Sequence, residues 1–270
     1  MKHLRWLFVT GVIMAVIIAG PTSAFAAVPS NDTMSGATVV SSLPYSQTLD
    51  TTEATTDSDD VTMNNPDFCG APATEASVWY TFTPSAEVGV VVDVSKSDYS
   101  AGVIVADGTP DNFVTCGPAQ IAFDAVAGHT YLILAFDDTA GGSNGGTLQI
   151  DMSAAPPPPQ LDVTIDPFGH VNGRTGVATF TGTFTCSGQA DFIELDGFVS
   201  QRVGRFAING YFFDGRDGSA CDGTTHPWSG STDPSSGKFA GGKATVNVDL
   251  FACSFFCSDA SASRTVTLKR

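Results

Sequence analysis

Residues 178–186 read ATFTGTFTC, and the alternation in this stretch decides the fold class. Apolar residues or glycine stand at every second position, and the positions between them are all threonine. A period of two places one set of side chains in a core and the other set in water, as in a half-buried antiparallel strand. The stretch therefore predicts an all-β fold in which Phe180 and Phe184 face the core.

Comparable runs lie on both sides of this stretch. They are rich in Val, Ile, Thr and aromatic residues and are separated by clusters of Gly, Asp, Asn and Pro. The runs cover residues 78–82, 88–94, 103–106, 130–136, 147–152, 244–250 and 266–268. Many short strands with frequent turns are typical of β-sandwiches. Beyond residue 27, no segment carries the pattern of an amphipathic helix.

A proline run divides the chain. Pro156 to Pro159 cannot donate the hydrogen bonds of a sheet, and such a run prefers an extended conformation. We therefore predict a semi-rigid linker over residues 154–160. It would join a sandwich over residues 28–153 to a second sandwich over residues 161–270.

The first 26 residues have the composition of a secretory signal peptide. Lys2 and Arg5 precede an apolar run, and Ala24-Phe25-Ala26 has the small-x-small pattern of a cleavage site. We expect residues 1–26 to be removed and the remaining chain to be secreted. No second apolar stretch approaches the length that would span a bilayer, so membrane insertion after cleavage is not expected.

The overall charge excludes two classes of partner. The formal net charge is -16, and removal of residues 1–26 leaves 10 Lys and Arg against 28 Asp and Glu, a net charge of -18. Nucleic acids and anionic membrane surfaces require clustered Lys and Arg, so neither is an expected partner. The chain is 42% hydrophobic and contains 19 Phe, which is sufficient for a packed core rather than a disordered acidic tail.

Six cysteines lie beyond the signal segment, and export favours disulfides over thiol chemistry or a zinc site. Paired CxxC motifs of the kind that bind zinc are absent. Many pairings are open in principle, but the proline run separates two cysteines from the other four. The expected pairs are Cys69 with Cys116, Cys186 with Cys221, and Cys253 with Cys257.

Residues 28–153 resemble the bacterial pre-peptidase C-terminal domain. The resemblance rests on Asn31-Asp32 and Ala37, on Thr51 to Thr55, on Val78 to Pro84 and on Ala127 to Ile133. It implies a jelly-roll-like accessory module that is sometimes stabilised by calcium and sometimes binds insoluble polymer. The peptidase that usually accompanies such a module has no counterpart in this sequence.

Residues 161–270 resemble, more faintly, the immunoglobulin-like domains of small secreted bacterial proteins. Thr183 to Cys186 correspond to a core strand, and Cys221-Asp222-Gly223 to a second anchor. The resemblance implies an immunoglobulin-like sandwich. Apoproteins that carry apolar small molecules are a looser relative.

Large aromatic residues are candidates for polymer binding, because a sugar ring packs its C–H face on an aromatic ring. Trp228 and His226 lie in the polar segment 224–230, and Trp79 faces away from the side that Val78 and Tyr80 share. A position that plugs the core is the favoured interpretation for Trp228, and Trp79 could be covered by a loop.

Carboxylates cluster at Asp57, Asp59 and Asp60, which makes this connection the best candidate for calcium. The spacing is not that of an EF-hand, so a solvated loop is the alternative. No other cofactor is expected.

The sequence contains no catalytic motif such as GxSxG or HExxH. We therefore expect a secreted, non-enzymatic binding protein whose partner is an extracellular polymer, the cell wall or another protein. An extracellular hydrolase with clustered carboxylates in a cleft is one alternative. A structural protein that assembles through strand edges is another.

Overall fold

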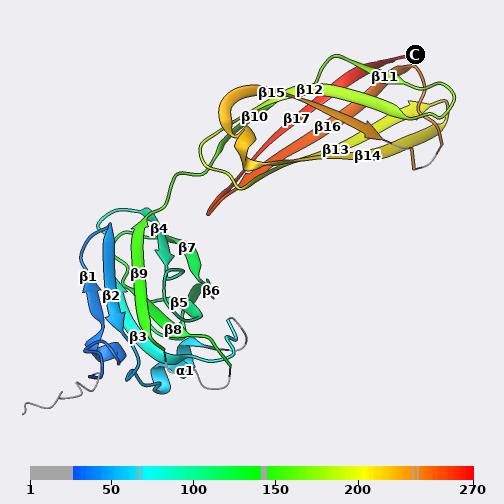
Figure 1. Ribbon diagram of the computed structural model, residues 1–270. Coiled ribbons are helices and arrows are strands. Elements are labelled where there is room, and N and C mark those ends of the chain that lie inside the picture. The colour runs from blue at the N-terminus through cyan, green and yellow to red at the C-terminus, as the bar shows by residue number, and fades with distance from the viewer. Residues whose placement is uncertain (1–26, 66, 68, 141–144, 233, 236) are drawn as a thin grey trace, which may run out of the picture.

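The computed structural model describes residues 27–65, 67, 69–140, 145–232, 234–235 and 237–270. The predicted signal segment, residues 1–26, lies outside these. The described chain is almost entirely β and forms two sandwiches, as Figure 1 shows. The all-β sandwich prediction is confirmed.

The described part of the N-terminal sandwich contains nine strands, one short α-helix and one 3-10 helix. Its elements are η1 (Met34–Gly36), β1 (Thr38–Val40), β2 (Tyr45–Asp50), α1 (Ser58–Met63), β3 (Glu75–Phe82), β4 (Val88–Asp93), β5 (Ala101–Asp107), β6 (Phe113–Pro118), β7 (Gln120–Ala125), β8 (Tyr131–Asp137) and β9 (Thr147–Ala154). One sheet has the order β1-β3-β8-β5-β6 and the other the order β2-β9-β4-β7. Without β1, this is the arrangement of a jelly roll, with four strands in each sheet.

The sheet that contains β3 is buried on both faces. Val78, Tyr80 and Phe82 pack between the two sheets. Trp79, on the opposite face of β3, packs in a second apolar cluster that includes Met63 of α1. Helix α1 therefore covers the outer face of a central strand, and the expectation that this region contains no helix is wrong.

The C-terminal sandwich is built from longer strands. Its elements are β10 (Gln160–Val163), β11 (Phe168–Val171), β12 (Ala178–Ser187), β13 (Phe192–Val203), β14 (Phe206–Asp217), η2 (Gly218–Ala220), β15 (Asp222–Thr232), β16 (Gly242–Cys253) and β17 (Cys257–Lys269). Strand β12 pairs with β15 on one side and with β10 and β11 on the other. On its other side β11 pairs with β17, and the sheet continues from β17 through β16 and β13 to β14. The parallel β11–β17 pair beside antiparallel hairpins resembles an immunoglobulin-like sandwich.

Three aromatic rings stack in the core of this sandwich. Phe212 lies between Phe180 and Trp228, with ring centroids 6.1 Å and 5.7 Å away. Glycines make room for the stack, because a Cβ at Gly197 or Gly230 would collide with the Phe212 ring. Glycine inside a strand often marks such a close approach.

The six cysteines form three disulfides, in the pairs that the sequence predicts. They join Cys69 to Cys116, Cys186 to Cys221 and Cys253 to Cys257. The first fastens the segment after α1 to β6, the second joins β12 to the start of β15, and the third closes the β16–β17 turn. The set is typical of an extracellular protein.

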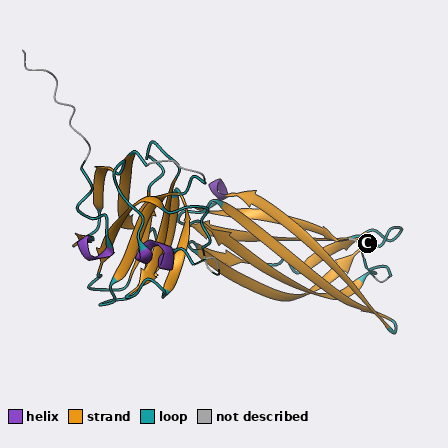
Figure 2. Cartoon of the chain, turned by 90° about the horizontal axis from the view of Figure 1, so that it is seen from below, coloured by secondary structure: helices purple, strands orange, loops and turns teal. Residues whose placement is uncertain are grey.

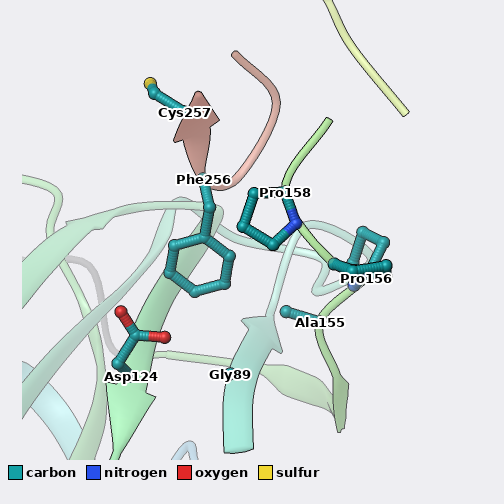
Figure 3. Close-up of a pocket in the computed structure, with 8 residues that line it drawn as sticks. Gly89, Asp124, Ala155, Pro156, Pro158, Phe256 and Cys257 are labelled. Carbon is teal, nitrogen blue, oxygen red and sulfur yellow. The ribbon is translucent and has the colours of Figure 1, made fainter. Parts of the chain in front are cut away.

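The two sandwiches meet at the proline connection, as Figures 1 and 2 show. Strand β9 continues to Ala154 and β10 begins at Gln160, so five residues without strand structure join the two sandwiches. Phe256, in the β16–β17 turn, points toward β4 beside Ala155 and Pro158 (Figure 3). A Cβ at Gly89 would lie 2.7 Å from the Cε2 atom of Phe256, so the absence of a side chain at Gly89 permits this contact.

Candidate functional site

Trp79 is fully buried and cannot contact a polymer. Its ring packs against Met63, Ile104, Leu134 and Phe136. Two elements cover it, helix α1 and the segment that contains Cys69. Tryptophan at this position is part of the core, and its interpretation as a binding residue is wrong.

Trp228 is also a core residue. It is 1% exposed, stacks on Phe212, and its Nε1 donates a hydrogen bond to the carbonyl oxygen of Thr164 at 2.9 Å. Although its sequence neighbours are polar, strand alternation turns the ring into the core of the C-terminal sandwich. The interpretation of Trp228 as an exposed platform is therefore wrong, and the alternative of a core plug is correct.

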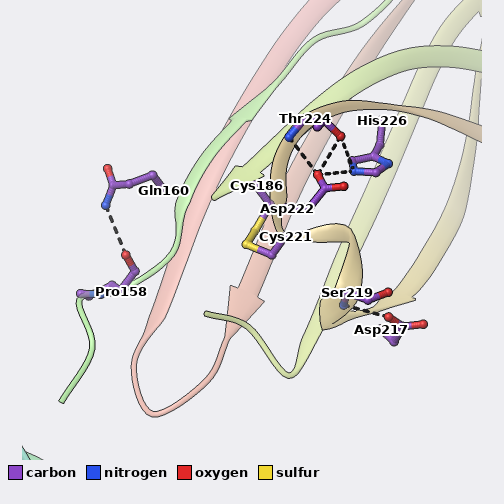
Figure 4. Close-up of a disulfide and its surroundings, with 9 residues drawn as sticks. All are labelled: Pro158, Gln160, Cys186, Asp217, Ser219, Cys221, Asp222, Thr224 and His226. Carbon is purple, nitrogen blue, oxygen red and sulfur yellow. Dashed lines mark hydrogen bonds and ion pairs between the residues drawn. A yellow bond between two sulfur atoms is a disulfide. The ribbon is translucent and has the colours of Figure 1, made fainter. Parts of the chain in front are cut away.

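His226 belongs to a local network at the start of β15, drawn in Figure 4. Its Nε2 lies 2.9 Å from Oδ1 of Asp222 and 3.1 Å from the hydroxyl of Thr224. Its ring stacks on Phe184 with a centroid distance of 5.4 Å. Hydrogen bonds from the Thr224 hydroxyl, from His226 and from the Thr224 backbone hold the pKa of Asp222 well below its usual range. The network fixes the turn beside the Cys186–Cys221 disulfide, and it lies in a different sandwich from Trp79.

The three aspartates proposed for calcium form the beginning of α1. Asp57 is the N-cap: its carboxylate accepts hydrogen bonds from the backbone N–H groups of Asp59 and Asp60. The Asp60 carboxylate in turn accepts the N–H of Asp57 at 2.6 Å, which completes a capping box. No group of three or more His, Cys, Asp or Glu among the described residues is arranged to hold a metal ion. These carboxylates stabilise a helix, and the structure does not support the calcium interpretation.

Asp60 is expected to make stability depend on pH. Burial raises the pKa of Asp60 from 3.8 to about 6, and the nearby charge of Asp57 adds to the rise. Between these values the folded protein keeps a proton that the unfolded chain releases, so stability falls as pH rises from about 4 to about 6. We expect the melting temperature of the parent protein to fall across this window by roughly 4 °C relative to that of Asp60→Asn.

The measurement is calorimetry of the parent and Asp60→Asn proteins at several pH values. Asp59→Asn, one residue away and partly exposed, is the matched control and should follow the parent. Parallel curves for the parent and Asp60→Asn would contradict the prediction.

Five of the six exposed aromatic rings in the described part of the C-terminal sandwich lie on β13, β14 and β16, which are neighbours in the sheet: Phe192, Phe206, Tyr211, Phe213 and Phe251. We call the set Phe198, Tyr211, Phe213 and Phe251 the aromatic face. Tyr211 is 70% exposed, Phe213 60% and Phe251 39%, and Phe198 is half-buried. Their side chains share the outer surface because the inward positions of the same strands are occupied by the core.

Strand register brings these rings together. Tyr211 is the cross-strand partner of Phe198, and their ring centroids are 4.9 Å apart. Phe213 follows Tyr211 on the same side of β14 and extends toward Gly215, where a Cβ would lie 2.9 Å from the Phe213 ring. Phe198 and Tyr211 thus form a ring pair, and Phe213 lies beyond it on the same outward side of β14. Contiguous exposed apolar surface usually marks an interaction site.

Polar side chains occupy the cross-strand positions beside the rings, in rows that run across β14, β13, β16 and β17. In one row, Phe213 is followed across the sheet by Asp196, Asp249 and Ser261. In the row beside it, Tyr211 is followed by Phe198, Asn247 and Ser263. The surface therefore combines aromatic rings with carboxylate, amide and hydroxyl groups.

Sequence reasoning missed this surface, although residues 209–213, Asn-Gly-Tyr-Phe-Phe, carried a signal for it. In a strand, Tyr211 and Phe213 must share one face while Phe212 takes the other. The only way for all three to be buried would be a sheet covered on both sides. The nearby glycines interrupt the alternating pattern, so the strand was not recognised from the sequence.

The family model described as a family of unknown function (DUF6299) matches residues 159–257. The match begins beside β10 and ends at the first residue of β17, so it spans most of the C-terminal sandwich and the whole of β14 and β13. It supports neither family resemblance that the sequence suggested. No curated protein matches the sequence.

Two solved structures show distant similarity. A glycosyl hydrolase family 2 member from Bacteroides cellulosilyticus is 9% identical with a TM-score of 0.28, and the match covers 70% of this chain and 27% of that one. A β-glucuronidase from Parabacteroides merdae is 9% identical with a TM-score of 0.26, covering 72% of this chain and 28% of that one. The chain thus spans little more than a quarter of either protein. Among the described residues, no helix is long and apolar enough to cross a membrane.

Proposed function

We propose that this chain is a secreted, non-catalytic carbohydrate-binding protein and that the aromatic face is its binding surface. The observation that carries the proposal is the pair Tyr211 and Phe213, which stay 70% and 60% exposed on a sheet whose other face is packed. Leaving large rings in water forgoes the stabilisation that burial would give, so an exposed group of them indicates a partner. Sugar rings suit this surface because they present C–H groups to rings and hydroxyls to polar neighbours.

The polar rows favour a carbohydrate over a purely apolar partner. Asn247, Ser261 and Ser263 continue the rows of rings across β16 and β17 and provide hydrogen-bonding groups beside them. An apolar partner would leave these groups without hydrogen bonds, at a cost in binding free energy. Three intrachain disulfides agree with action outside the cell.

The test is retention of the purified chain on a panel of insoluble polysaccharides. The Tyr211→Ala/Phe213→Ala double variant is expected to lose at least about tenfold in affinity, because each ring contributes on the order of 1 kcal/mol. Its melting temperature should change little, since both rings are mostly exposed. Phe168→Ala, which removes a ring that is 52% exposed on β11, is the matched control and should bind as the parent does.

Two results would overturn the proposal. One is failure of the parent chain to bind any polysaccharide in the panel. The other is equal binding by the parent and the double variant, which would place the binding surface elsewhere.

A further inference from the structure

The middle of the aromatic face carries a concentration of negative charge. Asp196 and Asp249 are direct cross-strand partners on β13 and β16. Glu194 and Asp259 lie in the next row, on either side of Phe251. Like charges directly opposite one another destabilise a sheet. Four carboxylates at adjacent positions therefore oppose folding unless something else balances them.

The described part of the chain offers these carboxylates no ion-pair partner. None of the four forms a salt bridge with a described residue. The basic residues that point outward from β13 and β16 are Arg202 and Lys243, each six positions from the acidic row. At about 3.3 Å per residue, they lie roughly 20 Å away, beyond the screening distance of physiological salt.

Resting on the proposed function, we infer that the aromatic face recognises an amino-sugar polymer whose amines are free and positively charged. The rings would stack on the sugar, and Asp196 and Asp249 would form charge-assisted hydrogen bonds with the ammonium groups. Along one row of the sheet the polymer would meet the ring of Phe213, then the two anionic acceptors Asp196 and Asp249, and then the hydroxyl of Ser261.

The charge also selects against other polymers. Uronic acid or phosphate-containing polymers would meet the four carboxylates and a chain with 28 acidic against 12 basic residues. A neutral polysaccharide would leave the carboxylates facing one another. A basic peptide would satisfy the charge, but the flanking side chains Asn247 and Ser263 and the exposed rings suit a hydroxylated ring better.

The experiment compares binding of the full chain to chitosan, a polymer of glucosamine, and to chitin, its neutral N-acetylated counterpart. At about pH 5.5 the amines of chitosan are charged. We expect preferential binding to chitosan, which weakens as salt increases and as pH rises enough to deprotonate the amines. The Asp196→Asn/Asp249→Asn variant, which keeps shape and removes two charges, should lose about tenfold in affinity for chitosan and far less for chitin.

Controls separate this inference from the proposed function and from general charge attraction. Glu53→Gln/Glu87→Gln removes two exposed charges from the N-terminal sandwich and should leave chitosan binding unchanged. Equal binding to chitosan and chitin, unaffected by Asp196→Asn/Asp249→Asn, would overturn the inference and leave the proposed function standing. Binding to poly-lysine beads as tight as to chitosan, insensitive to Tyr211→Ala/Phe213→Ala, would also overturn it. Failure on every polysaccharide would overturn both.

Discussion

Replacing Trp228 by alanine is expected to lower the free energy of unfolding of the C-terminal sandwich by about 3–5 kcal/mol. The ring is 1% exposed and lies against Phe212, so its removal leaves a cavity between the sheets. The substitution also removes the hydrogen bond from Nε1 to the carbonyl of Thr164. The neighbouring Gly182 has no side chain that could fill the space left by the ring. A larger residue could not be placed there either, because its Cβ would collide with the carbonyl oxygen of Thr164.

Calorimetry of the parent and Trp228→Ala chains measures this loss. In Trp228→Ala, Trp79 is the remaining tryptophan beyond residue 26, so its fluorescence reports the N-terminal sandwich separately and should follow that sandwich's own calorimetric transition in the parent. Phe213→Ala, which removes an exposed ring from the same sandwich, is the matched control and should cost far less. A cost below about 1 kcal/mol for Trp228→Ala would contradict its role as the core plug.

The two disulfides of the C-terminal sandwich are expected to differ in importance. Cys186 and Cys221 are 35 residues apart in sequence, whereas Cys253 and Cys257 are 4 apart. A longer loop removes more entropy from the unfolded chain, so removal of the first should cost about 4 kcal/mol and removal of the second about 2 kcal/mol. Cys186 is also buried in the core, which adds a packing cost.

The comparison uses Cys186→Ala/Cys221→Ala and Cys253→Ala/Cys257→Ala in the full chain, with denaturant midpoints as the measurement. Each double variant leaves the other bridge intact, so each serves as the control for the other. A larger loss from the Cys253–Cys257 pair would show that this short bridge stabilises the protein by some means other than loop closure.

The sequence was informative where a residue's surroundings follow from its own strand. The threonine alternation at 178–186 identified β12 and its inward side because period-two patterning is local. The Cys69–Cys116 pair followed from the position of the proline run, whereas the four later cysteines allowed three pairings and the expected one rested on the short loop between Cys253 and Cys257. Strands β13 and β14 were not predicted, since Gly197 and Gly210 interrupt the pattern. Gly197 is explained only by the Phe212 ring that occupies its space from the neighbouring strand.

The binding surface depends still more on partners distant in sequence. The polar neighbours of Trp228 left an exposed position open beside the favoured core position, and Thr164, its hydrogen-bond acceptor, is 64 residues away. The juxtaposition of Asp196 with Asp249 arises from pairing across 53 residues and cannot be read from either segment alone. The composition shows that the chain is acidic. Where the carboxylates lie side by side depends on the strand register.

The contact of Phe256 with the N-terminal sandwich gives the molecule a second mechanical connection. Phe251 of the aromatic face lies five residues before Phe256 on the same hairpin, whose strands are hydrogen-bonded along their length. A pulling force on anything held at Phe251 would be carried along β16 and β17 to Gly89 as well as through the prolines. Force applied at Phe251 would then reach the N-terminal sandwich by two routes.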